Sequence, residues 1–258
     1  MSGHLVSPTM RLTILGSSGT YPAPSNPASG YLIEAGSTRV WCEAGPGTFA
    51  ALTRRLDLAL LDAVVVSHRH PDHCMDLLSA YHAFAYGPMP QRGIPLYAPE
   101  QVFESVLSFL GQGPDGGFSS VFELHTVSDG DEVTVGNLGI SFAAADHTVP
   151  TVASRWSDGH RSMAYSADTG PRGDWARLVQ DAHLFLCEAA MGAAPYQRVI
   201  PHHLTAEQAG QIARERQARR LMLTHIPPHI ESPEAVAEAE RSFDRPVALA
   251  VPGAAHRI

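Results

Sequence analysis

Short apolar runs alternate along this chain with amphipathic stretches and with clusters of glycine, proline and serine. The β-branched run 63–66 stops at Ser67, which is typical of a fully buried strand. The runs 31–34 and 39–43 flank a short Ala-Gly-Ser turn and predict a hairpin. Further strands are expected at 11–15, 121–127, 132–135, 138–145, 151–156, 162–166, 184–187, 221–223 and 247–251. Helices are expected at 48–56, 74–86, 100–110, 174–180, 206–218 and 233–242, and a turn at 87–95.

This pattern predicts an α/β fold. Strand-rich stretches occur in both halves of the chain and are interleaved with amphipathic helices, which indicates two sheets packed face to face with helices outside. The glycine-rich segment 111–120 is a candidate boundary, but more strand follows it and no polar linker separates the halves. We therefore expect residues 1–258 to form a single domain, with 1–9 as a flexible N-terminus.

The charge pattern argues against a long nucleic-acid ligand. The chain has 258 residues, a formal net charge of -8 and 18 basic residues, all of them arginine. No basic run is longer than a pair such as Arg54-Arg55. A surface that tracks nucleic-acid phosphates needs a basic stripe, so we expect no long nucleic acid as a partner, while a small anion stays possible.

Cysteine usage and the apolar runs indicate a cytoplasmic protein. Cys42, Cys74 and Cys187 lie far apart, without the spacing of a disulfide framework or a cysteine zinc site. The first ten residues have neither a basic nor an apolar signal region. The longest apolar stretch, 58–66, contains Asp62 and is too short to cross a bilayer, so no membrane contact is expected.

Histidine is the residue type that points to chemistry, because the chain contains 14 of them. His68, His70, Asp72 and His73 fall within six residues, directly after the buried strand and before a helix. Imidazole nitrogens and carboxylate oxygens together suit zinc or manganese. A solvated polar loop is the alternative for a lone His-x-His, but the full spacing favours a metal site.

Three more candidate ligands follow later strands: His147, Asp168 and His225. Taken singly, each is more often a turn or capping residue. Their occurrence together with the His68–His73 cluster reverses that preference, since one ligand after each of several strands assembles a site at a sheet edge.

The order H-x-H-x-D-H, then His, then Asp in SADTG, then His after LMLT resembles the metallo-β-lactamase superfamily over nearly the whole chain. The phrases FLCEAA and HLTAEQAG are similar to the paired Glu and His loops of its RNase Z-like phosphodiesterase branch. Together with SHRHPDHCMDL, AYSADTG and LMLTHIPP, they look most similar to a small actinobacterial group that degrades cyclic nucleotides. The resemblance implies a four-layer αββα sandwich of two mixed sheets flanked by helices.

The resemblance also implies a site with two divalent metal ions, zinc in the first place and manganese or iron as alternatives. One ion is held by three histidines, the other by two histidines and Asp72, and Asp168 bridges the two. A shared carboxylate reduces the repulsion between two cations, and a water bridging them loses a proton near neutral pH and becomes the nucleophile. Asp72 orients that hydroxide as well as binding metal. The first set is His68, His70 and His147, and the second is Asp72, His73 and His225.

His203 and Glu188 are the expected catalytic partners of this centre. The resemblance places His203 near the leaving-group oxygen, with Glu188 hydrogen-bonded to its far ring nitrogen, as a general acid or an oxyanion clamp. The alternative role of this segment is to begin the helix 206–218, with Thr205 and Gln208 forming a capping box, and both roles are compatible.

The other histidines are not assigned a role in the chemistry. His202 is expected to be a bystander or at most a substrate contact. His82 could line the pocket, but a buried structural histidine is the preferred interpretation. Surface or packing positions are expected for His4, His125, His160, His183, His229 and His256.

The predicted activity is hydrolysis of a small phosphodiester, most specifically a 3′,5′-cyclic nucleotide of the cyclic AMP type. The main alternative is tRNA 3′-end processing, but such enzymes carry a glycine-rich basic arm, and 111–120 contains an aspartate and no arginine. Thioester, lactone and β-lactam hydrolases share the metal ligands, although class B β-lactamases usually use a cysteine where this chain has Asp168. A non-catalytic binding protein is disfavoured because all seven ligand positions are filled. Relatives suggest a homodimer.

Overall fold

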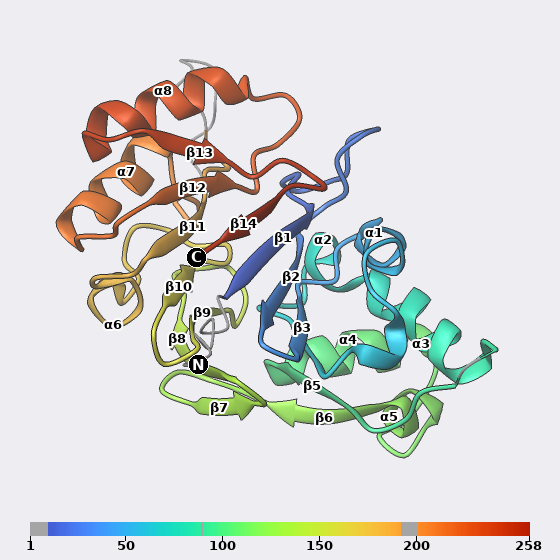
Figure 1. The fold of residues 1–258 in the computed structure, drawn as a ribbon. Coiled ribbons are helices and arrows are strands. Elements are labelled where there is room, and N and C mark those ends of the chain that lie inside the picture. The colour runs from blue at the N-terminus through green and yellow to red at the C-terminus, as the bar shows by residue number, and fades with distance from the viewer. Residues whose placement is uncertain (1–9, 89, 192–200) are drawn as a thin grey trace, which may run out of the picture.

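Two seven-stranded sheets form the centre of the computed structural model, which describes residues 10–88, 90–191 and 201–258 (Figure 1). The segment 1–9, expected to be flexible, lies outside the described residues. The first sheet has the order β14 (Ala255–Arg257), β1 (Arg11–Gly16), β2 (Gly30–Ala35), β3 (Thr38–Cys42), β4 (Ala63–Val65), β5 (Ile94–Ala98) and β6 (Phe122–Thr126). The second has the order β13 (Val247–Leu249), β12 (Leu221–Thr224), β11 (Leu184–Glu188), β10 (Ser162–Tyr165), β9 (Val152–Ser157), β8 (Leu138–Ala144) and β7 (Glu132–Val135).

Both sheets are mixed, as expected. In the first, β14, β1, β2 and β3 pair antiparallel, whereas β3, β4, β5 and β6 run parallel. In the second, β10 to β13 run parallel, and β7 to β10 pair antiparallel. Parallel strands need crossover connections, and the helices supply them. The carboxyl ends of the parallel strands therefore gather on one edge of each sheet.

Helices cover the outer face of each sheet, so that four layers result (Figure 1). Beside the first sheet lie α1 (Thr48–Thr53), η1 (Leu58–Leu60), α2 (Pro71–Cys74), α3 (Asp76–Tyr86), α4 (Glu100–Leu110) and α5 (Gly117–Val121). Beside the second lie α6 (Trp175–Val179), α7 (Ala206–Glu215) and α8 (Ser232–Phe243). Among the described residues, no helix combines the length and the apolar character needed to cross a bilayer.

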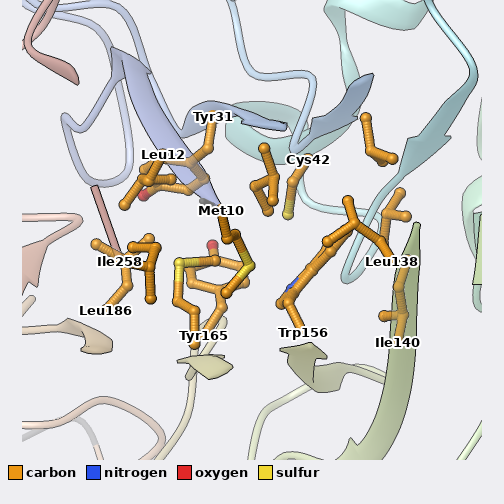
Figure 2. Packing of buried hydrophobic residues seen from close by; sticks show 14 of the residues in the cluster. Met10, Leu12, Tyr31, Cys42, Leu138, Ile140, Trp156, Tyr165, Leu186 and Ile258 are labelled. Carbon is orange, nitrogen blue, oxygen red and sulfur yellow. The ribbon is translucent and has the colours of Figure 1, made fainter. Parts of the chain in front are cut away.

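The main core lies between the two sheets (Figure 2). Leu12 and Tyr31 from the first sheet and Trp156 and Tyr165 from the second are all at most 2% exposed. The rings of Tyr31 and Tyr165 meet edge to face at 5.3 Å between centroids, a favoured geometry for aromatic pairs. Trp156 donates its indole N–H to Ser154 Oγ over 2.9 Å, so its burial leaves no polar group unpaired. Two further clusters bury the helices on the outer faces.

Several predicted boundaries differ from the structure. Strand β6 begins one residue later than the predicted strand 121–127, because 117–121 is the helix α5, which overlaps the glycine-rich segment 111–120. Strand β5 begins at Ile94, inside the predicted turn 87–95. It pairs with β4 and β6, and no local sequence pattern encodes this pairing. The predicted helix 74–86 is divided into α2 and α3 at Met75. Strand β14 was not predicted, since it forms only by pairing with β1.

Candidate metal centre

The segment His68–His73 leaves β4 and enters the short helix α2. His70 is extended and precedes the helix, and Pro71 occupies its first turn, where a proline costs no hydrogen bond. His68 and His70 therefore lie before the helix, whereas Asp72 and His73 lie on it. A side chain at Gly45 would come within 2.1 Å of the carbonyl oxygen of Asp72, so only glycine allows this close approach.

Four side chains converge in a first cluster: His68, His70, His147 and Asp168. Nδ1 of His70 lies 3.1 Å from Nε2 of His68 and 3.1 Å from Nε2 of His147. Asp168 Oδ2 lies 3.8 Å from the first of these Nε2 atoms and 3.9 Å from the second. Ligands placed tetrahedrally at ~2.0–2.1 Å from zinc lie about 3.3 Å apart, so the nitrogen spacing fits a shared cation.

A second cluster contains Asp72, His73, Asp168 and His225. Nε2 of His73 lies 3.2 Å from Asp168 Oδ1 and 3.5 Å from Asp72 Oδ2. Nε2 of His225 lies 3.3 Å from Asp168 Oδ2 and 3.8 Å from Asp72 Oδ2. Asp168 thus belongs to both clusters, and its carboxylate lies where a bridging ligand is needed. The structure brings all seven predicted ligands together.

Buried hydrogen bonds orient two of these rings from outside. Glu43 Oε2 lies 2.7 Å from Nδ1 of His73, and Glu43 Oε1 accepts the N–H of Ser67 over 2.8 Å. The hydroxyl of Ser67 in turn lies 2.9 Å from Nδ1 of His68. Each contact engages the outer ring nitrogen and leaves Nε2 facing the clusters, which is how ligating histidines are held.

The rings of His225 and His147, whose Nε2 atoms also face the clusters, are held in the same way. Nδ1 of His225 lies 2.8 Å from the hydroxyl of Ser29. Nδ1 of His147 donates to the carbonyl oxygen of His202 over 3.1 Å. His225 itself has a positive φ of 53°, and Gly19 leaves room beside it, since a Cβ there would lie 2.5 Å from its carbonyl oxygen. The loop between β1 and β2 is therefore packed against this ligand.

The inward atoms of the second cluster fit a cation. Among the described residues, Nε2 of His73, Nε2 of His225 and Oδ1 of Asp168 are buried without a hydrogen-bond partner. Buried polar atoms normally have one, so these three need a ligand of another kind. Nitrogen and carboxylate donors of this kind suit zinc, manganese or iron. The chemistry of the donor set thus agrees with divalent metal ions.

The charge states favour the metal-binding forms in the first cluster. Burial lowers the pKa of His68 well below its usual range, and the neighbouring ring of His73 lowers it further. Burial likewise lowers the pKa of His147 to about 4. Burial alone raises the pKa of Asp168, but His225 and His73 outweigh it and hold that pKa well below its usual range. Neutral imidazoles and an ionised carboxylate are the forms that bind metal.

Glu188 and His203 form a second functional element beside the clusters. Glu188 ends β11, is fully buried, and accepts the backbone N–H groups of Thr169 over 2.7 Å and Ala190 over 3.0 Å. Its Oε1 also lies 2.9 Å from Nδ1 of His203. Burial lowers the pKa of His203, but the carboxylate of Glu188 outweighs this effect and raises it to about 9.

The ring of His203 lies against the candidate ligands. Its centroid is 5.1 Å from that of His147 and 6.1 Å from that of His225, to which it is nearly parallel at 10°. The capping box predicted for α7 is present, since Thr205 and Gln208 each accept a backbone N–H of the other. Capping fixes the end of the 201–205 segment and leaves the His203 side chain free to face the site.

The two histidines left open have different positions. His202 contributes its carbonyl oxygen to His147, while its ring lies 3.8 Å from Asp146 Oδ1. His82 is exposed on α3, where Nδ1 donates to the carbonyl of Leu78 over 2.8 Å. The interpretation of His82 as a buried structural residue is therefore wrong, because it lies on the solvent side of an amphipathic helix.

Three polar residues of the site were not predicted: Ser29, Glu43 and Ser67. Glu43 follows β3 and has a positive φ of 63°, a conformation that costs energy for a residue with a Cβ. One signal was available in the sequence, because Glu43 ends a buried apolar run just as Glu188 does. The two serines carry no local signal, and only the tertiary contacts reveal them.

Comparison with known proteins agrees with this fold. The family model for the beta-lactamase superfamily domain matches residues 38–226. The uncharacterized protein Rv1339 of Mycobacterium tuberculosis is 35% identical over 254 residues, which cover 95% of this chain and 91% of the relative. The chain therefore belongs to the metallo-β-lactamase superfamily.

Relatives with more specific descriptions are hydrolases. A Bacillus subtilis protein described as the probable metallo-hydrolase YhfI is 27% identical and covers 95% of this chain and 98% of itself. A ribonuclease Z of Myxococcus xanthus is 24% identical, with 95% of this chain and 96% of that protein covered. The crystal structure of YhfI superposes with a TM-score of 0.86 at 25% sequence identity, covering 97% of this chain and 100% of that one. The crystal structure of the human short-form tRNase Z superposes with a TM-score of 0.74 at 18% sequence identity, covering 96% of this chain and 99% of that one. This likeness reflects the fold alone. The chain is a metal-dependent hydrolase of this fold.

Proposed function

We propose that this hydrolase is a dinuclear metal-dependent phosphodiesterase acting on a small phosphodiester, specifically a 3′,5′-cyclic nucleotide of the cyclic AMP type. The observation that carries the proposal is the Glu188–His203 pair, which lies next to both ligand clusters. Within the pair, Oε1 of Glu188 is 2.9 Å from Nδ1 of His203. Ester hydrolysis at a metal centre needs a nucleophile and a means of protonating the leaving group. The pair supplies a candidate for the second task.

Bound at the two clusters, divalent ions would polarise the phosphoryl oxygens and lower the pKa of water. The clusters His68–His70–His147 and Asp72–His73–His225, joined by Asp168, are the proposed ligand sets. Their converging donor atoms support this assignment. Besides binding metal, Asp72 would orient the attacking water or hydroxide.

The protein groups divide the proton transfers between them. Glu188 accepts the Nδ1 proton of His203, and so the opposite nitrogen, Nε2, is the one that can face a substrate. An ionised Glu188 also favours the doubly protonated ring. His203 can therefore give an Nε2 proton to the leaving oxygen, or stabilise the charge that develops there.

Cleavage of a tRNA precursor is the second candidate, and the ribonuclease Z relatives favour it. Two features of this chain argue against it. The net charge is -8, and the glycine-rich segment 111–120, which would need to be basic to serve as a tRNA-binding arm, carries no arginine. Its second half belongs to α5. A polyanion gains little affinity from such a surface, so a small phosphodiester is the better substrate.

Hydrolysis of a thioester, lactone or β-lactam is less well supported. Among the described residues, the two ligand clusters contain no cysteine, and Cys42, Cys74 and Cys187 are all buried as free thiols. The pair of His203 and Glu188 also argues against these substrates, because by sequence resemblance it belongs to phosphodiester cleavage. Cyclic nucleotide specificity within the phosphodiesters rests on the sequence phrases around the ligands, such as AYSADTG and FLCEAA.

A side-by-side assay tests this proposal. One metal-loaded preparation is offered cyclic AMP, a tRNA precursor, a β-lactam and a thioester, with bis-p-nitrophenyl phosphate as a general phosphodiester. We expect turnover of cyclic AMP and of the chromogenic diester. Turnover of the thioester or lactam alone contradicts phosphodiester cleavage, and turnover of the tRNA precursor alone favours the second candidate.

Metal content and assembly complete the proposal. We infer two transition-metal ions per chain, with zinc as the first choice and manganese or iron as alternatives, which elemental analysis of the purified protein measures. We also propose a cytoplasmic homodimer. Light scattering during size-exclusion chromatography distinguishes a dimer from a monomer, and cell fractionation tests the location.

A further inference from the structure

A groove with a volume of about 570 Å³ opens beside the candidate metal centre. It lies at the carboxyl ends of β5 and β6, where α4 begins, and its other wall is the loop between β8 and β9. Strands β4, β5 and β6 are parallel, so this groove and the His68–His73 segment share one edge of the sheet. His147 belongs both to the groove wall and to the first ligand cluster. The groove therefore adjoins the candidate metal centre at His147.

The walls of the groove suit an uncharged organic group. Hydroxyl groups come from Thr126, Ser128 and Thr148, and apolar surface comes from Val149 and Pro150. The volume falls within the ~300–1,000 Å³ of small-molecule pockets. Apolar surface interspersed with hydroxyl groups matches a sugar with an attached base, or an aryl group. No arginine lines this groove among the described residues.

The two charged side chains of the groove, Glu100 and Asp129, are both acidic. Asp129 forms an ion pair with Arg177 and accepts the N–H of Ala144 over 3.1 Å, so its charge is balanced. Glu100 is exposed and, among the described residues, makes neither an ion pair nor a side-chain hydrogen bond. The unbalanced charge of this groove is therefore negative and is carried by Glu100.

Glu100 also makes the N-terminus of α4 less favourable for a bound anion. The helix has 11 residues, its N-cap is Pro99, and no side chain caps it. The N-terminus of such a helix favours a negative charge, and Glu100 in its first turn supplies one. With Glu100 present, a second anion meets a carboxylate rather than a free helix terminus.

We propose that this groove binds the uncharged organic arm of the phosphodiester and that Glu100 selects against substrates that place a second phosphate there. The inference rests on the proposed function and adds a substrate preference to it. A single phosphate at the metal centre with a neutral arm in the groove describes a cyclic nucleotide or a simple diester. In a polynucleotide, a further phosphate follows each linkage and meets the carboxylate.

Substitution of Glu100 tests the selection. The substrates are adenylyl-(3′→5′)-adenosine and the same dinucleotide with an added 5′- or 3′-terminal phosphate. The wild-type protein is expected to show a higher kcat/KM for the unphosphorylated dinucleotide. Glu100→Gln lowers that preference about fivefold, the effect of one unit charge several ångströms away in a solvated groove. Glu100→Arg lowers it further, and added salt lowers it in the wild type.

The matched control is Glu104→Gln, an exposed glutamate one turn further along α4 that does not line the groove. It is expected to leave the preference unchanged. An equal shift in both variants, or none in Glu100→Gln, overturns the inference while the proposed function stands. Wild-type protein that cleaves no diester overturns both.

A second variant tests whether the groove is occupied at all. Thr126→Trp fills the groove from the end of β6, where the side chain is exposed. Its kcat/KM is expected to fall at least fivefold more for the dinucleotide than for methyl p-nitrophenyl phosphate, whose small arm does not need the groove. Circular dichroism verifies that the variant is folded. Equal losses for both substrates overturn the subsite.

Discussion

Glu43 Oε2 lies 2.7 Å from Nδ1 of His73, and neither side chain is exposed to solvent. A carboxylate can only accept a hydrogen bond, so Nδ1 of His73 carries a proton and Nε2 is the nitrogen that faces the second cluster. The same carboxylate holds the N–H of Ser67, at the start of the loop that carries the other ligands. One buried acid therefore fixes a ligand ring and the loop beside it.

Glu43→Gln is expected to weaken metal binding about 10- to 100-fold, because the amide no longer increases the basicity of the His73 ring. Competition with a chromogenic chelator measures the affinity. Glu123→Gln, an exposed position far from the ligands in sequence, serves as the control. An unchanged affinity in Glu43→Gln contradicts the positioning role.

Asp168→Ala is expected to abolish binding of two metal ions per chain. Its two oxygens lie 3.2 Å from Nε2 of His73 and 3.3 Å from Nε2 of His225, and it also belongs to the first cluster. Without it, two cations would repel each other with no shared anion between them. Elemental analysis should give one ion or fewer, with at least a hundredfold loss of kcat on bis-p-nitrophenyl phosphate, roughly the range of one catalytic group. A variant that keeps both ions and full activity would falsify the assigned centre.

His203→Gln and Glu188→Gln are expected to reduce kcat by ~10²–10⁴-fold while metal content stays at the wild-type level. The reason is that the pair lies beside the clusters and is not counted among their donor atoms. Substrates with a good leaving group, such as p-nitrophenolate, should lose less than cyclic AMP, since they need less protonation. His202→Gln is the neighbouring control and should change kcat little, because its carbonyl rather than its ring meets His147. Equal losses on both substrates argue against a proton donor.

The ring of His203 should titrate with a pKa of about 9 in the metal-free protein. Burial opposes this value, and the carboxylate of Glu188 causes it. Since the folded pKa exceeds the ordinary value of 6.5, the pair stabilises the fold fully below pH about 6.5, and this contribution is lost as the pH rises through about 9. Nuclear magnetic resonance of the ring protons measures the pKa after chelation. Glu188→Gln should bring it to 6.5 or lower, and a value that stays near 9 would show another cause.

The ion pair between Asp146 and Arg172 tests how the loop that carries His147 is positioned. Asp146 directly precedes His147, and Arg172 donates to both of its carboxylate oxygens over 3.0 Å. Gly170 packs against the same carboxylate. Arg172→Ala is expected to lower kcat by a few fold with folding unchanged, because an exposed ion pair contributes only about 0–1 kcal/mol. Thermal unfolding and kinetics on one preparation measure both quantities. A large drop in melting temperature contradicts this interpretation.

The chemistry of the ligands was largely visible in the sequence, because it is local. Four donors within His68–His73 share one turn, and any fold that ends a buried strand there brings them close together. His147, Asp168 and His225 were predicted from a different regularity, since one ligand after each of several strands assembles a site at a sheet edge. Glu188 and His203 followed from the resemblance to a known family, and the structure places their side chains in contact.

The tertiary structure decided what depends on distant pairing. Strand β14 exists because Arg257 pairs with Arg11, at opposite ends of the described chain, and β5 exists because β4 and β6 flank it. The outer contacts of Glu43 and Ser29 join segments that are 30 and 196 residues apart. The groove at Glu100 likewise combines two sheets and a helix. Residue types and their spacing determine which ligands are available, whereas long-range packing determines how each ring is oriented and which substrate can reach it.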